Sequence, residues 1–240
     1  TKKDNNMKKF IFKTFSLVGL CAVILVGSAN ADTLRMAYSA APKTVDPYKS
    51  SASPTASLNE HIYEALVSRT NQKLLATSYH WEDDTTLVVN LRKGVKFHNG
   101  ADFTAQDVIY SSCRMMYRVN DKKNMLTSAM SPVVDVVALD DHTVAFKTVG
   151  LYPILIQKLK SLSILSAGDA DLGPELKFDN TGDCGITRYP TKAQFESGEF
   201  ANGTGQYKLV SFANTGDANL VRNDQYWGEP SNWDLSLIHI

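Results

Sequence analysis

The sequence predicts a mixed α+β fold, because strand and helix signals alternate along 240 residues without internal repeats. Two β-hairpins are indicated, one by the β-rich runs 133–139 and 143–149 and the other by residues 206–213 and 219–223. A helix is indicated after Thr104, because Thr104 and Asp107 have the spacing of a capping box. In such a box each side chain satisfies a backbone N–H at the helix start. With 43% hydrophobic and 21% charged residues, the composition is that of a globular protein.

The first half of the chain supplies further elements. Residues 33–38 alternate apolar and polar positions, which favours an extended piece. Residues 44–47 form a turn, because the residue before a proline is disfavoured in the helical region. A polar loop is expected over residues 50–54, a helix over 57–67 and a strand over 86–91.

The second half contains one more predicted helix and a long irregular stretch. Pro153 is expected in the first turn of a helix that continues to Leu162, because a proline there needs no N–H. Residues 167–203 carry scattered glycine, aspartate and proline, which is typical of loops.

The N-terminus has the pattern of a secretory signal peptide. A positive start at Met7-Lys8-Lys9 is followed by the mostly apolar run 10–27 and by the small residues of Ala29-Asn30-Ala31. We expect cleavage after Ala31, in preference to a membrane anchor, since Lys13 interrupts the apolar run and leaves it short.

The charge of the chain excludes some partners. The formal net charge is zero, but five lysines lie in the first 31 residues, which leaves 20 basic and 24 acidic residues in the remainder. A mildly acidic body without a basic patch gives no reason to expect nucleic acid or anionic lipid as a partner.

Two cysteines remain once Cys21 is removed with the signal peptide. In an oxidising compartment, Cys113 and Cys184 are an even pair that invites a disulfide. The alternative is that Cys113 is a small buried apolar residue. The sequence does not decide between them, because a bridge requires Cα atoms within about 7 Å.

The stretch Asn90-Leu91-Arg92-Lys93-Gly94-Val95-Lys96-Phe97-His98-Asn99-Gly100, running on to Thr104-Ala105-Gln106-Asp107-Val108, resembles a signature of extracellular solute-binding protein family 5. This group contains the peptide- and oligopeptide-binding proteins of ABC transporters. Further stretches resemble family motifs in the same order along the chain: Val45-Asp46-Pro47, residues 62–67, 75–81, 140–146, 203–209 and 222–227. One departure is Gln206, where the family usually has proline.

The resemblance implies a two-lobed periplasmic binding protein type II fold with an extra subdomain. Residues 1–31 would be upstream residues and the signal peptide, 32–61 the first segment of the main lobe, 62–166 the extra subdomain and 167–240 the second segment of the main lobe. Because family members are about twice as long, the chain is expected to be truncated before the second lobe and to bind ligand poorly by itself.

The resemblance also implies a function. The protein would be the periplasmic substrate-binding component of a peptide-type ABC importer, a monomer without enzymatic activity or cofactor. It would hold a di- or oligopeptide or related solute between its lobes, in the strand-addition mode, and deliver it to a membrane permease. Binders of nickel chelates, haem, oligosaccharides and opines belong to the same family, so the solute stays open.

The expected ligand contacts are Ser51, Ala52 and Ser53, because the main lobe in the family contacts ligand just downstream of the Asp46-Pro47 turn. The alternative is an ordinary solvated loop. Trp81 and Trp227 have the size to line a cleft, although aromatic residues of this size more often fill cores.

The alternative function is a secreted hydrolase or carbohydrate-active domain. The sequence contains no Gly-x-Ser-x-Gly, no phosphate-binding loop and no His-Glu-x-x-His. The run 169–173 lacks the glycine and glutamate positions of a calcium loop. His98 is expected to be a structural imidazole, Asp107 a helix cap and Arg92 a residue that pins a turn.

Overall fold

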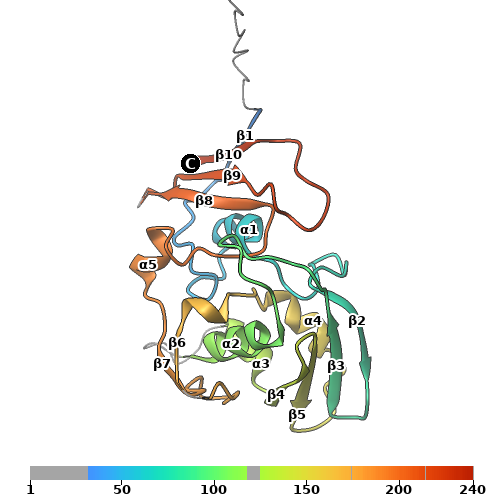
Figure 1. Ribbon diagram of the computed structural model, residues 1–240. Coiled ribbons are helices and arrows are strands. Elements are labelled where there is room, and N and C mark those ends of the chain that lie inside the picture. Colours follow the sequence, from blue (N-terminus) through green and yellow to red (C-terminus); the bar gives the residue numbers. More distant parts are fainter. Residues whose placement is uncertain (1–31, 118–124, 174, 214, 240) are drawn as a thin grey trace, which may run out of the picture. The chain divides into compact units, whose positions relative to one another are not determined.

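The computed structural model describes residues 32–117, 125–173, 175–213 and 215–239 (Figure 1). The predicted signal peptide therefore lies outside the described residues. Within these ranges no helix has both the length and the apolar character needed to cross a membrane.

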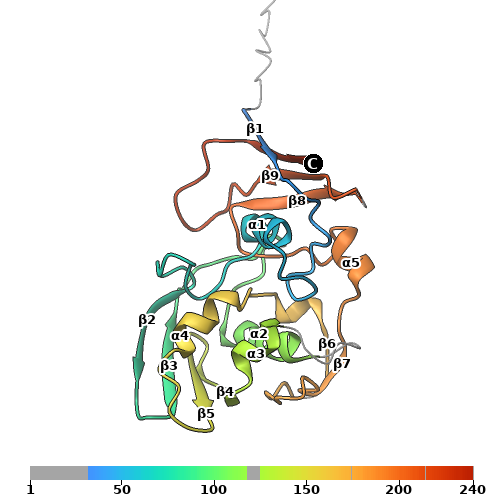
Figure 2. The same cartoon turned by 180° about the vertical axis from the view of Figure 1, so that it is seen from behind.

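The first sheet joins the start of the described chain to its end. Its strand order is β1-β10-β9-β8, with β1 parallel to β10 and the other neighbours antiparallel. The strands are β1 (Thr33–Ala37), β8 (Tyr207–Phe212), β9 (Ala218–Arg222) and β10 (Leu235–His239). Figures 1 and 2 show the blue first strand against the red last strands. Helix α1 (Ser53–Ile62) packs beside β8.

The second sheet is antiparallel throughout and lies entirely within residues 76–148. Its order is β2-β3-β5-β4, so β3 and β5 are the central strands. The strands are β2 (Ala76–Trp81), β3 (Thr86–Leu91), β4 (Val133–Asp140) and β5 (Thr143–Thr148). Helix α2 (Ala105–Met116) packs against β4 and β5, and α3 (Met125–Met130) lies beside α2.

The remaining elements are short. They are α4 (Leu155–Lys158), two 3-10 helices (Leu159–Ser161 and Ala167–Asp169), the two-stranded sheet of β6 (Asp171–Leu172) and β7 (Ile186–Arg188), and α5 (Lys192–Glu196). A single cluster of buried apolar side chains runs through the described chain, including Leu58 of α1, Val89 of β3, Val108 of α2 and Leu220 of β9.

Both predicted hairpins, the strand at 86–91 and the capped helix after Thr104 are confirmed. Two helix predictions were wrong in their extent. The helix expected over 57–67 spans Ser53–Ile62, with Pro54 in its first turn. It ends early because the carbonyls of Ala65 and Leu66 accept hydrogen bonds from residues 74–76. The helix expected to reach Leu162 ends at Lys158 and continues as a 3-10 turn.

The segment Gly203-Thr204-Gly205 passes directly against the C-terminal end of α1. The Gly205 N–H donates to the Ile62 carbonyl at 2.9 Å. A Cβ at Gly203 would lie 2.0 Å from the Ile62 carbonyl oxygen, and one at Gly205 would lie 2.5 Å from the carbonyl oxygen of His61. Both contacts are with backbone, which cannot swing aside, so glycine is required for this close approach.

Replacing Gly203 with alanine is therefore expected to destabilise the protein by about 3 kcal/mol, because the added methyl group forces two backbone segments apart. Denaturant unfolding monitored by circular dichroism measures this change. The matched control is Gly150→Ala, where no atom lies within 4 Å of the added Cβ, and its unfolding free energy should change by less than about 1 kcal/mol. Equal effects of the two substitutions would contradict the close-approach explanation.

Candidate ligand-binding site

The turn at residues 44–47, which precedes the predicted ligand contacts Ser51–Ser53, is held by a buried ion pair. Asp46 is fully buried and Arg114 of α2 is 2% exposed. One carboxylate oxygen of Asp46, Oδ2, accepts a hydrogen bond from Arg114 Nη2 at 2.5 Å, and the other accepts from the Tyr48 N–H at 3.0 Å. The Asp46 N–H donates to Thr44 Oγ1 at 3.1 Å. Both oxygens are thus used to fix the turn, and neither is left for a ligand.

Two tyrosines fasten the same turn to neighbouring segments. Tyr48 donates its hydroxyl hydrogen to the Ser163 carbonyl at 2.5 Å, and Tyr63 donates to the Val45 carbonyl at 2.9 Å. Burial raises the pKa of both hydroxyls well above the ordinary tyrosine value. They therefore remain protonated donors at neutral pH, and the turn is held from both sides.

Ser51, Ala52 and Ser53 lie side by side at the exposed start of α1. Ala52 is the N-cap residue, and Ser53 is the first helical residue rather than part of a loop. All three are exposed. The Ala52 N–H donates to Ser50 Oγ at 3.3 Å, and within the described chain the hydroxyls of Ser51 and Ser53 make no hydrogen bond.

The start of α1 can accept an electron-rich group. No side chain caps it. Pro54 has no N–H and Thr55 is fully buried, so the backbone donor at this end is the N–H of the exposed Ser53, to which the helix dipole adds partial positive charge. A peptide carbonyl or a carboxylate is the kind of group that such a terminus binds. The geometry is compatible with the predicted contacts, and their role stays a prediction.

A second buried carboxylate, Glu64, is one that the sequence alone does not single out. It lies just beyond α1 and is 6% exposed. Its Oε2 accepts hydrogen bonds from Thr204 Oγ1 and Trp227 Nε1, both at 2.8 Å, and its Oε1 accepts from the Tyr226 hydroxyl at 2.9 Å. Burial raises the pKa of Glu64. A glutamate inside an otherwise apolar motif was the available signal for this structural role.

Arg92 pins a turn, as predicted. Its Nε donates to the Leu74 carbonyl at 2.9 Å, and its guanidinium lies 3.9 Å from the centroid of the Trp227 ring. This stacking places Trp227 in the Glu64 network. Trp81 is partly buried and packs against the core.

His98 is a structural imidazole with backbone partners on both ring nitrogens. Nε2 lies 3.0 Å from the Gly205 carbonyl, and Nδ1 accepts from the Gly203 N–H at 3.4 Å. These partners assign the proton to Nε2. Burial lowers the pKa of His98 to about 4, so the ring is neutral at pH 7.

Asp107 is a helix cap, as predicted. It accepts hydrogen bonds from the N–H groups of Thr104 and Ala167, both at 2.7 Å, and burial raises its pKa to about 6.

The loop aspartate Asp169 accepts hydrogen bonds from the side-chain amides of Asn99 and Asn202 at 3.3 and 2.7 Å. Within the described residues, no group of three His, Cys, Asp or Glu side chains could hold a metal ion.

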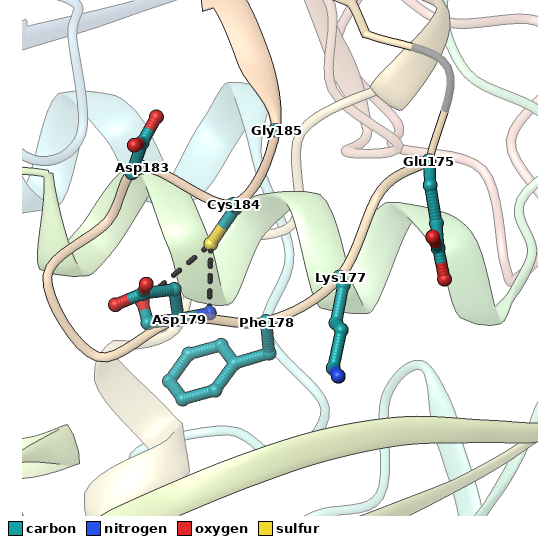
Figure 3. A pocket seen from close by; sticks show the side chains of 7 residues that line it. All are labelled: Glu175, Lys177, Phe178, Asp179, Asp183, Cys184 and Gly185. Carbon is teal, nitrogen blue, oxygen red and sulfur yellow. Dashed lines mark hydrogen bonds between the residues drawn. The ribbon is translucent and has the colours of Figure 1, made fainter.

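The open question of the two cysteines is answered by a disulfide between Cys113 and Cys184, with Cα atoms 6.1 Å apart. A hollow of about 320 Å³ lies beside it (Figure 3). Its lining residues are Glu175, Lys177, Phe178, Asp179, Asp183, Cys184 and Gly185. Ser51–Ser53 do not line this hollow.

The chain matches one family model and several known proteins. The model of bacterial extracellular solute-binding proteins, family 5 (Middle), matches residues 71–235. The nickel-binding protein NikA of Staphylococcus aureus is 23% identical over 224 residues, which are 91% of this chain and 40% of NikA. The periplasmic oligopeptide-binding protein OppA of Haemophilus influenzae is 22% identical over 79% of this chain and 36% of OppA.

Solved structures show the same relationship. DppA of Helicobacter pylori, in complex with the peptide STSA, superposes with a TM-score of 0.67 at 25% identity, over 86% of this chain and 42% of DppA. The murein tripeptide-binding protein MppA of Escherichia coli superposes with a TM-score of 0.69 at 16% identity, over 88% of this chain and 42% of MppA.

The chain belongs to the bacterial extracellular solute-binding proteins of family 5. Its fold is that of the type II periplasmic binding proteins, as the sequence predicted. The chain spans about two fifths of the length of the curated relatives that it matches.

The depressed pKa of His98 predicts an acid-sensitive contribution to stability. The unfolded chain binds a proton at about pH 6.5, whereas the folded protein resists it down to about pH 4. This contribution is therefore complete above pH 6.5 and is lost as the pH falls toward 4. Lowering the pH from 7 to 5 should therefore reduce the free energy of unfolding by about 2 kcal/mol through the protonation of His98.

Urea unfolding at both pH values tests this effect in the parent protein and in His98→Gln. The parent should lose about 2 kcal/mol more than the variant on acidification. His80→Gln, at an exposed position on β2, serves as the control and should behave as the parent. The same pH dependence in His98→Gln as in the parent would contradict the lowered pKa of His98 as the cause.

Proposed function

We propose that the protein is the solute-capturing component of a peptide-type ABC import system. It acts in the periplasm after removal of the signal peptide, binds a di- or oligopeptide or a related solute between two lobes, and delivers it unchanged to a membrane permease. The observation that carries this proposal is membership of family 5, since its relatives are substrate-binding proteins of ABC transporters.

The arrangement of the sheets supports a division into a main lobe and an extra subdomain. Residues 32–61 and 167–240 would form the main lobe, and 62–166 the extra subdomain. The first sheet takes its strands only from residues 33–37 and 207–239, whereas the second lies wholly within 76–148. The peptide named with the Helicobacter DppA structure and the oligopeptide in the name of OppA favour a peptide as solute.

The geometry of residues 44–53 supports Ser51, Ala52 and Ser53 as ligand contacts. A binding site is most precise when its contact residues rest on rigid elements. Here the exposed residues follow directly from a turn held by the buried Asp46–Arg114 pair and lead directly into a helix. The hydroxyls of Ser51 and Ser53 and the Ser53 N–H would bind the carbonyl oxygens of an extended peptide backbone.

The competing function is a secreted hydrolase or carbohydrate-active domain. Such an enzyme needs a nucleophile with its base, or two accessible carboxylates about 5–10 Å apart. The buried carboxylates of Asp46, Glu64 and Asp107 are instead occupied by internal donors. These contacts favour binding over catalysis in this part of the protein.

Incubating the complete gene product with a pool of di- to hexapeptides separates the two functions. After gel filtration and denaturation, mass spectrometry should recover bound peptides with unchanged masses, and the unbound pool should be intact. Nickel in the same fractions is quantified in parallel. Cleavage products that increase with time would overturn the transport function in favour of a hydrolase.

Substituting Ser51 with tryptophan should weaken binding of the recovered peptide at least tenfold, because a bulky ring would occupy the space of the ligand backbone. Thermal stability should be preserved, since substitutions at exposed positions change stability by only about 0.5 kcal/mol. Isothermal titration calorimetry measures the affinity. Ser161→Trp, at an exposed serine remote in sequence, is the control, and equal affinities of the two variants would remove Ser51 from the site.

A further inference from the structure

The segment that carries Ser51–Ser53 is fixed on both sides. Before it, Asp46 binds Arg114 and the Tyr48 N–H. After it, in the first turn of α1, Thr55 Oγ1 accepts a hydrogen bond from the Lys43 N–H at 3.0 Å, which ties the helix start back to the residue before the turn. The position of Ser51–Ser53 therefore depends on where Arg114 holds Asp46.

Arg114 is itself held by aromatic rings. Its guanidinium carbon lies 5.5 Å from the centroid of the Tyr189 ring and 5.8 Å from that of Phe195. Its Nε is buried and has no hydrogen-bond partner in the described part of the chain. With Asp46 on one side, the rings supply the packing that orients the guanidinium, and cation–π attraction favours this placement.

Tyr189 belongs to a segment that is bound covalently to α2. The disulfide joins Cys184 to Cys113, the residue immediately before Arg114. The Tyr189 hydroxyl donates to the Gly182 carbonyl at 2.7 Å, and the Tyr189 ring lies 4.1 Å from that of Tyr117 at the end of α2. Figure 3 shows Cys184 and Asp179 together, and the Asp179 N–H lies 3.0 Å from Cys184 Sγ.

The contact between this segment and α2 leaves no spare room. A Cβ at Gly182 would lie 2.4 Å from the backbone nitrogen of Tyr117. Segment 179–189 therefore sits directly on the C-terminal end of α2, and the disulfide keeps it there. If the bond is absent, Tyr189 is held over Arg114 only by non-covalent contacts.

We propose that Arg114 is a positioning residue for the ligand-contacting residues Ser51–Ser53, and that the Cys113–Cys184 disulfide sustains it by holding Tyr189 over its guanidinium. This inference rests on the proposed binding function. Arg114 and both cysteines are buried, so in this proposal they act on ligand binding through the turn. They set ligand affinity by keeping the Asp46 turn in one conformation, which removes an ordering cost from binding.

The proposed relay runs from the disulfide through Tyr189 and Arg114 to the Asp46 turn. Hydrogen–deuterium exchange of the complete gene product without ligand tests it directly. In the double variant Cys113→Ala/Cys184→Ala, amides of residues 44–56 should exchange about tenfold faster, while those of β3 keep the parent rates. Exchange that rises equally in both regions, or in neither, would overturn the relay, because a merely structural disulfide produces one of these two patterns.

Affinity for the peptide Ser-Thr-Ser-Ala, measured by calorimetry, provides the second readout. The double cysteine variant and Arg114→Lys should each bind it about five- to tenfold more weakly. Combining them should give no further loss, since coupled residues are not additive. Independent, multiplying losses would contradict the proposal. A parent protein that binds no peptide would count against the proposed function, while the exchange experiment still decides the relay.

Variants of Tyr189 keep the test decisive if the cysteine variant fails to fold. Tyr189→Leu removes the ring and preserves the disulfide, and it should reproduce both the faster exchange of residues 44–56 and the weaker binding. Tyr189→Phe retains the ring and should restore the parent values. Lys96→Ala, which removes an exposed ion pair with Asp102, is the control and should change neither readout. Parent-like exchange in Tyr189→Leu would overturn the relay.

Discussion

The buried ion pair between Asp46 and Arg114 is the interaction on which the candidate site depends. It joins residues 68 positions apart, one in the turn before α1 and the other in α2. Charges this deeply buried are costly to desolvate, and removing one partner of such a pair typically costs about 3–5 kcal/mol because the other is left uncompensated. The pair therefore fixes the conformation of the turn at residues 44–48, which is buried.

The Glu64 network has the same role between other parts of the chain. Its three donors come from Thr204, Tyr226 and Trp227, so a single carboxylate joins the end of α1 to two segments of the last quarter of the chain. The glycines on either side of Thr204 permit this, because they let the backbone approach the α1 carbonyls. Buried charge and close backbone approach together hold the first sheet to the rest of the structure.

The sequence predicted the local elements well where their signals are local. The β-rich runs 133–139 and 143–149, joined by Asp140-Asp141-His142, were sufficient to predict the β4–β5 hairpin. The spacing of Thr104 and Asp107 was sufficient to predict the start of α2. The end of α1 was placed too late because Leu66 has the helical spacing of the apolar residues Leu58 and Ile62, although its carbonyl accepts from Leu74 and Ala76. That pairing is tertiary and has no local signature.

The supports of the candidate site were less predictable. Asp46 was recognised through its motif, but its partner Arg114 lies in an amphipathic helix, where an arginine is usually solvated. The pairing of Cys113 with Cys184 and the placement of Tyr189 over Arg114 depend on the distance between segments 71 residues apart, which composition and spacing do not determine. The exposure of Ser51–Ser53 followed from the two serines and from the turn before them.

We propose that the protein closes around a solute and leaves it chemically intact. Solution X-ray scattering of the complete gene product, with and without the solute recovered from it, measures the closure most directly. A smaller radius of gyration is expected with solute bound, because two lobes would close about a hinge. An unchanged radius of gyration at saturating solute would contradict it.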